Sequence, residues 1–180
     1  MTAVTERVVL LAEDGTAVGT ADKADVHTAE TPLHLAFSCW VFDSRGRVLL
    51  TRRALSKRTW PGVWTNSFCG HPGPDEDMPA AIRRRALTEL GIEVAGVEEV
   101  LPEFRYRATD ASGIVENEIC PVFRAVTLDD VEPNPDEVAE FQWVEPHALV
   151  QAVRATPFAF SPWLGWELQA WVGFPRARWS

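Results

Sequence analysis

Cysteine, histidine and tyrosine are scarce in this chain of 180 residues, which contains three cysteines, four histidines and one tyrosine. The odd number of cysteines gives no disulfide framework, so reduced thiols in a cytoplasmic protein are the simplest interpretation. Long apolar runs are also missing near the N-terminus, where a short apolar stretch ends before Glu13. That stretch is too short for a signal peptide or a membrane span.

Basic residues are outnumbered by acidic ones. The chain contains 17 lysines and arginines and 26 aspartates and glutamates, which gives a formal net charge of −9. This balance argues against nucleic acid or an anionic membrane as a partner, but it allows a local basic pocket for a small anionic substrate. No linker or repeat divides the sequence, so we expect a single domain over residues 1–180. Nothing in the sequence requires more than a monomer.

Tryptophan, by contrast, is abundant, with eight residues in the chain and four of them in the last twenty. These four are Trp163, Trp166, Trp171 and Trp179. A C-terminal segment this aromatic is expected to pack against the rest of the protein.

The apolar pattern predicts several strands and two helices. Strands are expected over residues 8–11, 17–20, 33–43, 48–53, 104–108 and 115–126. Residues 75–90 have the three-to-four spacing of a helix that ends at Gly91, and Pro146 introduces a second helix over residues 145–154. This mixture predicts an α/β (α+β) fold in which helices sandwich a mixed β-sheet.

The most specific motif lies between Gly70 and Ile92. Its residues Gly70, Glu76, Arg84, Glu89, Gly91 and Ile92 fall on the pattern G-x5-E-x7-R-E-U-x-E-E-x-G-U, in which U is aliphatic. This pattern resembles the Nudix box, whose glutamates gather magnesium ions around a diphosphate. Arg85 and Thr88 replace two of its three clustered glutamates. The chain therefore looks built to hold a diphosphate and poorly built to cut it.

A second group of residues has the chemistry of a metal site. Glu116 and Glu118 lie two apart in a predicted strand, so they share one face and need protons or a cation between them. With His27, His34 and His71 they would form a site of nitrogen and oxygen ligands that suits manganese, magnesium or zinc. Ordinary histidines and an exposed Glu-Asn-Glu edge are the alternative, and spacing alone leaves both open.

Cys69, Tyr106 and Trp163 are each open to two interpretations. Cys69 lies close to His71, so it is either a nucleophile or acid/base group or a buried structural cysteine. The single tyrosine, Tyr106, is either a functional residue or an aromatic residue on a strand, and Trp163 taken alone is a core residue.

Basic residues gather in two places. Arg53 and Lys57 follow a predicted strand, and both are suited to bind phosphate oxygens, whereas Arg52 should face the other way. Arg83 is expected on a solvated helix face, but Arg85 occupies a position that faces the metal in the Nudix box and is therefore a phosphate-binding candidate.

Further runs resemble those of the type I isopentenyl-diphosphate isomerases, most closely the bacterial form. They are T-P-L-H-L-A (31–36), T-R-R-A-L-S-K (51–57), W-P-G-V-W-T-N-S-F-C-G-H-P (60–72), F-R-Y-R-A-T-D (104–110), G-I-V-E-N-E-I-C-P-V-F (113–123) and F-S-P-W (160–163). The resemblance spans roughly residues 5–165. It implies a Nudix-like fold with an N-terminal extension and an aromatic C-terminal segment.

This family interconverts isopentenyl diphosphate and dimethylallyl diphosphate by moving a double bond. The resemblance implies a first metal bound by His27, His34, His71, Glu116 and Glu118, and a magnesium ion that arrives with the diphosphate and binds Glu89. It implies Cys69 and Glu116 as the proton-handling pair, with Tyr106 beside Glu116 and Trp163 as an aromatic wall. It implies Lys23, Arg53, Lys57 and Arg85 as diphosphate ligands.

Two other functions compete with this interpretation. A Nudix-type diphosphohydrolase needs a metal-activated water near the bond that it cuts, and Arg85 and Thr88 argue against such an arrangement. A non-catalytic diphosphate-binding module would have no use for the thiol of Cys69 opposite a carboxylate.

Overall fold

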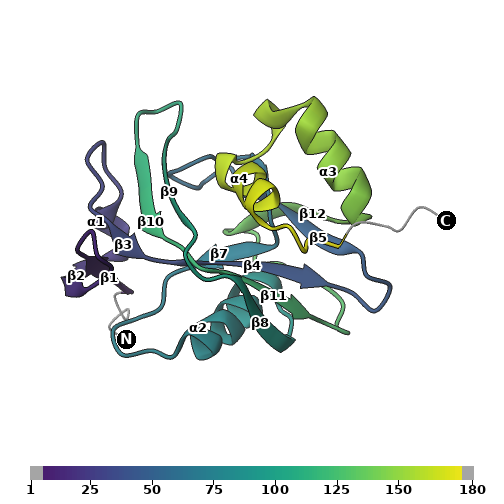
Figure 1. Cartoon of the computed structure of the whole chain (residues 1–180), viewed down its shortest axis with the longest axis horizontal. Coiled ribbons are helices and arrows are strands. Elements are labelled where there is room, and N and C mark those ends of the chain that lie inside the picture. The colour runs from purple at the N-terminus through teal and green to yellow at the C-terminus, as the bar shows by residue number, and fades with distance from the viewer. Residues whose placement is uncertain (1–5, 176–180) are drawn as a thin grey trace.

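The computed structural model describes residues 6–175, which form two β-sheets joined end to end and covered by helices (Figure 1). The five-stranded sheet has the order β2 (Ala17–Asp22), β1 (Arg7–Leu11), β3 (His34–Leu35), β10 (Val115–Ile119), β9 (Arg105–Thr109). The path of the seven-stranded sheet is β12 (Val138–Val144), β5 (Val48–Arg53), β4 (Phe37–Phe42), β11 (Val122–Val126), β8 (Ala95–Leu101). The predicted α+β architecture is confirmed, since helices cover a mixed sheet on both faces.

Two long strands expected from the sequence are each divided between the two sheets. The segment 33–43 breaks at Ala36 into β3 and β4, and the segment 115–126 breaks at Cys120 and Pro121 into β10 and β11. Pro121 has no amide hydrogen, so a continuous ladder cannot pass through it. Bonds from Ala36 N to Ile119 O (3.0 Å) and from Ser38 N to Pro121 O (3.1 Å) keep the two segments side by side across the junction.

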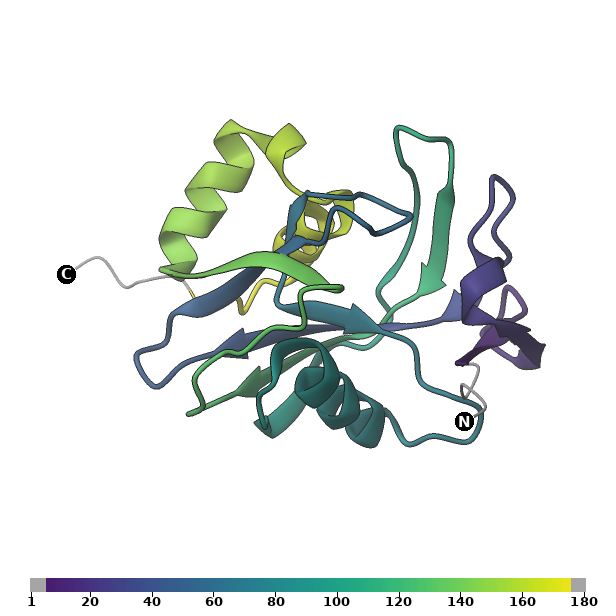
Figure 2. The same ribbon diagram turned by 180° about the vertical axis from the view of Figure 1, so that it is seen from behind.

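The faces of β4 alternate between two helical layers. Phe37, Cys39 and Val41 pack toward α2 (Met78–Arg85) in one apolar cluster. Trp40 and Phe42 pack in a second cluster with α3 (Pro146–Ala155) and α4 (Pro162–Ala170). This two-residue period is that of a strand buried on both sides. Figure 2 shows the same arrangement from behind, with α3 at the end of the molecule opposite the N-terminal strands.

A short segment with two strands is inserted between β4 and β5. These strands pair only at Phe42 and Val48, and beyond that point β6 (Trp64–Thr65) pairs with β5 while β7 (Phe68–Gly70) pairs with β4. Ser67 holds the inserted segment, because its Oγ accepts from Val41 N and donates to Leu49 O, both at 2.7 Å. The W-T-N-S-F-C-G run is thereby fixed at the centre of the protein.

The helix of the Nudix-like box begins later than predicted. Asp75 has a φ of 61°, and Asp77 caps α2 by accepting a hydrogen bond from Ala80 N, so the segment before it forms a turn. After Arg85 the helix continues as a π-helical turn, η1 (Ala86–Leu90), and Gly91 ends it with a φ of 65°, as expected. The predicted second helix is confirmed as α3.

Among the described residues, seven elements were missing from the sequence-based expectations, namely α1 (Lys23–Val26), β6, β7, β8, β12, η2 (Pro157–Ala159) and α4. The aromatic C-terminal segment does pack down, since Trp171 and Phe174 are buried against Trp40. Trp166 is 40% exposed, and Trp179 lies outside the described residues. In the described part of the chain, no helix has the length and apolar character needed to cross a membrane.

Candidate active site

A cavity of about 220 Å³ lies where the two sheets meet, and it gathers almost every residue singled out from the sequence. Its lining includes Lys23, His27, Arg53, Lys57, Cys69, His71, Arg85, Glu89, Tyr106, Glu116, Glu118 and Trp163. The remaining candidate, His34, is fully buried next to His27 and His71. Chain segments that are far apart in the sequence therefore form one polar site.

Three histidines and one glutamate converge at the inner end of this site. One ligand atom from each of His27, His34, His71 and Glu118 lies within 4.8 Å of all the others. The parallel pairing of β10 with β3 places Glu118 directly opposite His34. Glu118 Oε1 lies 3.3 Å from His34 Nε2 and 3.1 Å from His71 Nε2.

The hydrogen bonds around these residues leave ring nitrogens directed into the cluster. Nδ1 of His34 lies 2.9 Å from Pro32 O, which makes that nitrogen the donor. In the neutral imidazole, Nε2 then carries a free electron pair. Among the described residues, Nε2 of His27, Nε2 of His34 and Nδ1 of His71 have no hydrogen-bond partner of good geometry. Buried polar atoms without partners are costly, so this donor set fits a divalent cation.

The ionisation of the cluster points the same way. Burial alone would raise the pKa of Glu118, but the close imidazoles of His34 and His71 hold it well below its usual value. Burial lowers the pKa of His71 and so favours the neutral imidazole that binds metals. Burial acts to lower the pKa of His34 as well, but its contact with Glu118 raises that pKa above the usual value. A cation bound here would take the place of the proton on His34.

Glu116 lies beside this cluster rather than at its centre. Its Oε2 is 3.0 Å from His27 Nε2, and its Oε1 accepts a hydrogen bond of 2.7 Å from Thr59 Oγ1. The sequence implied that Tyr106 lies beside Glu116, but the pairing of β9 and β10 sets Tyr106 opposite Glu118. The Tyr106 hydroxyl accordingly donates to Glu118 Oε2 at 2.9 Å.

Cys69 is a partly exposed thiol on β7, held next to the side chain of Asn66. Its Sγ lies 3.5 Å from Asn66 Oδ1, which accepts the S–H hydrogen bond. Protein atoms shield Sγ from water and so raise the pKa of the thiol well above its usual value. The described structure contains no disulfide, and all three cysteines are free.

Trp163 forms an aromatic wall of the cavity. Its ring stacks on Tyr106 with centroids 5.7 Å apart and meets the edge of Trp60 at 5.2 Å. The guanidinium of Arg53 lies 5.7 Å from the indole centroid, which shows that a cation is accommodated at this ring.

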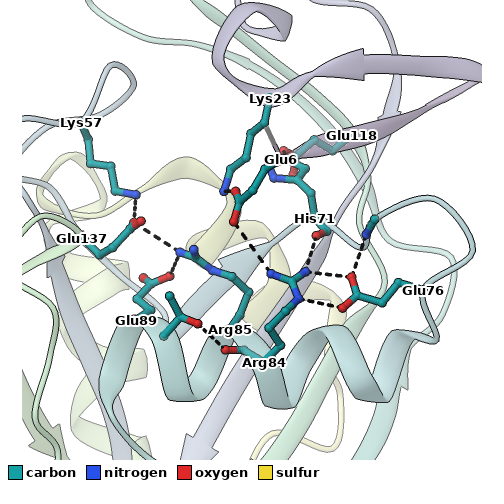
Figure 3. A network of polar contacts seen from close by, with 12 residues as sticks. Glu6, Lys23, Lys57, His71, Glu76, Arg84, Arg85, Glu89, Glu118 and Glu137 are labelled. Atoms are coloured by element: carbon teal, nitrogen blue, oxygen red, sulfur yellow. Dashed lines mark hydrogen bonds and ion pairs between the residues drawn. The ribbon is translucent and has the colours of Figure 1, made fainter. Parts of the chain in front are cut away.

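The outer end of the cavity is lined by cations that already have carboxylate partners (Figure 3). Glu137 contacts both Lys57 and Arg85, and Arg85 also contacts Glu89. Burial opposes ionisation of Glu137, but the charges of Arg85 and Lys57 lower its pKa to about 2. Lys23 pairs with Glu6 at 2.5 Å.

Arg85 owes its position to a glycine. A Cβ atom on Gly70 would lie 2.7 Å from both Arg85 Cγ and Phe37 Cζ, so only glycine lets the arginine enter the cavity. Arg85 is 4% exposed, whereas Arg83 is exposed, as predicted. Arg52 points away from the cavity, as predicted, and donates to Gly62 O.

Sequence reasoning missed Thr59, Asn66, Glu137 and Glu6. Asn66 and Thr59 fall in or beside the W-T-N-S-F-C-G-H-P run, which was a usable signal. Glu137 and Glu6 carry no local signal, because only tertiary pairing brings them to the cations. A larger groove of about 590 Å³ between α3 and α4 has no histidine, cysteine or carboxylate in its lining.

The chain is similar in sequence to known proteins. The NUDIX domain family matches residues 32–164. An isopentenyl-diphosphate Delta-isomerase of Clavibacter michiganensis is 67% identical over 91% of this chain and 84% of its own length. One from Corynebacterium glutamicum is 59% identical over 94% of this chain and 93% of its own length.

The fold is similar to that of solved proteins with little sequence identity. DR0079 from Deinococcus radiodurans has a TM-score of 0.72 at 19% identity, covering 93% of this chain and 99% of that protein. A MutT protein from Methanosarcina mazei has a TM-score of 0.63 at 20% identity, covering 78% of this chain and 93% of that one.

Proposed function

The chain belongs to the NUDIX family and, within it, to the isopentenyl-diphosphate Delta-isomerases, and from this premise we propose how its residues carry out the isomerisation. The substrate pair is isopentenyl diphosphate and dimethylallyl diphosphate, which differ only in the position of one double bond. Cys69 and Glu116 handle the two protons, Trp163 faces the reacting carbons, and the cations at the outer end bind the diphosphate. The observation that carries this proposal is the single cavity that all these groups line.

The diphosphate is bound by exchange of ion-pair partners. Lys23, Lys57 and Arg85 are each paired with a carboxylate in the cavity wall, and phosphate oxygens replace some of these contacts. Arg53 donates to Thr59 O and reaches the same cavity. This anchoring supplies binding energy to a substrate whose reacting end is a plain hydrocarbon.

We further propose a divalent metal at the inner end and a second one at the outer end. Manganese, magnesium or zinc fits the ligands His27, His34, His71 and Glu118, with Glu116 completing the site. A magnesium ion that enters with the diphosphate is bound by Glu89. A bound cation supplies positive charge that keeps the neighbouring carboxylates ionised and fixes their orientation.

The reaction needs one proton added and one removed. A proton is delivered to the terminal carbon of the double bond, which leaves positive charge on the tertiary carbon. Loss of a proton from the neighbouring methylene then forms the new double bond, so the substrate gains and loses one proton. Cys69 on β7 and Glu116 on β10 reach the cavity from different sheets, as two groups on opposite faces of a substrate require.

The aromatic residues shield and stabilise the substrate while its tertiary carbon carries positive charge. Trp163 and Tyr106 stack in parallel, and Trp60 closes the edge of the indole, so these faces exclude water from a cation that water would trap. We assign the protein to the cytoplasm as a monomer acting on this small molecule, in keeping with its free thiols.

Diphosphate hydrolysis is disfavoured by the box helix. At the two altered positions, the side chain of Arg85 fills the cavity wall and Thr88 Oγ1 donates to the backbone oxygen of Arg84 at 2.8 Å. Neither residue supplies a carboxylate for the metal-activated water that hydrolysis requires.

Incubation with isopentenyl diphosphate and magnesium in deuterated water, followed by NMR, tests the proposal. Dimethylallyl diphosphate that carries deuterium and an intact diphosphate is the expected product. Release of phosphate would instead identify a hydrolase, and unchanged substrate would identify a binding module. A Glu116→Gln variant with normal turnover and full metal occupancy would overturn the role of that residue.

A further inference from the structure

Glu167 is a buried carboxyl group behind the active site that the reaction described above does not use. It lies on α4, one turn after Trp163, so the two side chains share a helix face. It is 0% exposed, and its neighbours Leu164 and Leu168 on α4 belong to the second apolar cluster. Burying a carboxyl group is costly, and an apolar residue of similar size would fill the same space without that cost. The presence of a carboxyl group at this buried position therefore needs an explanation.

The polar contacts of Glu167 all fall on one oxygen. Oε2 accepts hydrogen bonds from Ser38 Oγ at 2.9 Å and from Trp40 Nε1 at 2.6 Å. Ser38 and Trp40 are two apart on β4, so both face α4. Oε1 has no partner among the residues that the structure describes.

The contacts continue from Ser38 to the active site. Asn66 Nδ2 donates to Ser38 Oγ at 2.8 Å, and Asn66 Oδ1 accepts from Trp163 Nε1 at 3.1 Å. The same Oδ1 lies 3.5 Å from Cys69 Sγ. Asn66 Nδ2 lies at the same 3.5 Å from that sulfur, so the amide contacts the thiol through both its oxygen and its nitrogen, and the indole through its oxygen.

The orientation of the Asn66 amide is set by several acceptors of its NH₂ group. Ser38 Oγ is the nearest at 2.8 Å, and Phe68 O (3.1 Å) and Cys39 O (3.3 Å) are the others. A hydroxyl has one hydrogen, and because Ser38 gives it to Glu167, only lone pairs remain for Asn66. The Asn66 amide must then point its NH₂ group toward Ser38, which turns its oxygen toward Trp163 and Cys69. If Ser38 instead turned its hydrogen toward Asn66, two donors would face each other. The amide would then be displaced from its place beside Trp163 and Cys69, although its bonds to Phe68 O and Cys39 O oppose a full rotation.

The charge state of Glu167 is consistent with a purely accepting role. Burial raises its pKa to about 8, although Ser38 and Trp40 both act to lower it. Near neutral pH the group is a neutral acid, with Oε2 as the carbonyl oxygen and the proton on the partnerless Oε1. Glutamine has the same shape and the same acceptor.

We propose that Glu167 is a positioning residue for the isomerisation, which fixes the Ser38 hydroxyl and, through Asn66, orients the Cys69 thiol and the Trp163 indole. This inference rests on the function proposed above for Cys69 and Trp163. It assigns Glu167 no proton transfer and no contact with substrate.

Three variants test the proposal by steady-state kinetics. Glu167→Gln keeps the acceptor, so its kcat should stay within about threefold of the parent protein. Glu167→Leu removes the acceptor and should lower kcat by roughly 30- to 100-fold, since misorientation of reacting groups by about 1 Å costs on the order of 10²-fold. KM should change little, because the diphosphate-binding cations are untouched. Ser38→Ala should lower kcat by as much as Glu167→Leu does. The double variant Ser38→Ala/Glu167→Leu should lose no more kcat than either single variant.

An NMR readout separates orientation from a general loss of structure. The indole N–H resonance of Trp163 should shift in Glu167→Leu and Ser38→Ala and stay in place in Glu167→Gln. If Glu167→Leu does not fold, Ser38→Ala carries the same test by itself. Loss of kcat in Glu167→Gln equal to that in Glu167→Leu would overturn the proposal, as would a Glu167→Leu protein with parental kcat.

Failure of the proposed function gives a different result. Parental turnover in Cys69→Ala would show that the thiol has no role in the reaction. The Trp163 resonance would still report whether Glu167 orients the hydrogen bonds from Ser38 through Asn66 to the indole. The two ideas therefore fail in separate experiments.

Discussion

Replacing Glu167 with glutamine should stabilise the protein by an amount that grows as the pH rises from about 4.5 to about 8. Burial raises the pKa of Glu167 to about 8 from the 4.5 of an ordinary glutamate. Between these values the folded protein keeps a proton that the unfolded chain releases, so rising pH favours unfolding. At about 1.4 kcal/mol per pH unit, the native carboxyl costs up to ~3 kcal/mol at pH 7 and ~5 kcal/mol at pH 8. Glutamine does not titrate and avoids this cost.

Urea denaturation of both proteins at pH 5, 6, 7 and 8 measures the effect. The difference in unfolding free energy between variant and parent should be small at pH 5 and increase at each step, while contributions from other titrating groups cancel. Glu103→Gln is a matched control, since Glu103 is exposed and its difference should stay flat. A Glu167→Gln difference that is constant from pH 5 to pH 8 would refute the reasoning.

Three further predictions follow from the site and the fold. Cys69→Ala should lose turnover by at least about 10²-fold and still bind substrate in calorimetry, and unchanged turnover would contradict the assigned role. Glu89→Gln should raise the magnesium concentration needed for half-maximal activity while metal analysis finds the histidine site filled, and an unaltered magnesium dependence would count against it. Gly91→Ala should lower the unfolding free energy by about 2–4 kcal/mol in urea titrations, because φ is 65° and the new Cβ would lie 2.6 Å from Glu132 O. The control Gly113→Ala, with a φ of 89° and open space around it, should cost only about 1 kcal/mol, and equal losses in the two variants would exclude the clash.

Much of the site could be predicted because its residue types are informative wherever they occur. Glu116 and Glu118 share a strand face by the two-residue period alone, and four histidines in the whole chain leave few candidates for a metal site. The distant candidates His27 and His71 could be assigned to one metal site only through the resemblance of the surrounding runs. Spacing could not bring them together, because sheet pairing does that.

The residues that sequence reasoning missed are partners rather than ligands. Glu137 reaches Lys57 and Arg85 because β12 pairs with β5, and that pairing joins segments more than 80 residues apart. In the sequence, Glu167 is a single polar position in an apolar helix. Its role as an acceptor becomes visible only because β4 places Ser38 within hydrogen-bonding distance. Such contacts depend on tertiary structure, and no local pattern encodes them.

The strands predicted over residues 8–11, 17–20, 48–53 and 104–108 are confirmed as β1, β2, β5 and β9, whereas the breaks in the two long strands and the two edge strands were missed. Residues 115–126 are apolar enough for one continuous strand, and Pro121 was the available signal for a break. β8 and β12 were missed because their exposed positions carry charged residues, which weakens the apolar pattern at these edge strands.

The junction between the two sheets sets how much change in length the protein can tolerate. His34 lies before the crossing at Ala36 and Ser38 lies after it. The number of residues between them therefore fixes which side chains of β4 face each layer, relative to those of β3. Deleting or inserting one residue there would reverse inside and outside along the strand, and would misplace either the side chain of His34 or the layer that faces α4. Turns such as residues 44–46 and 110–113 have no such constraint and are open to insertions. The protein should therefore accept substitutions near Ala36 far more readily than any change in the length of that segment.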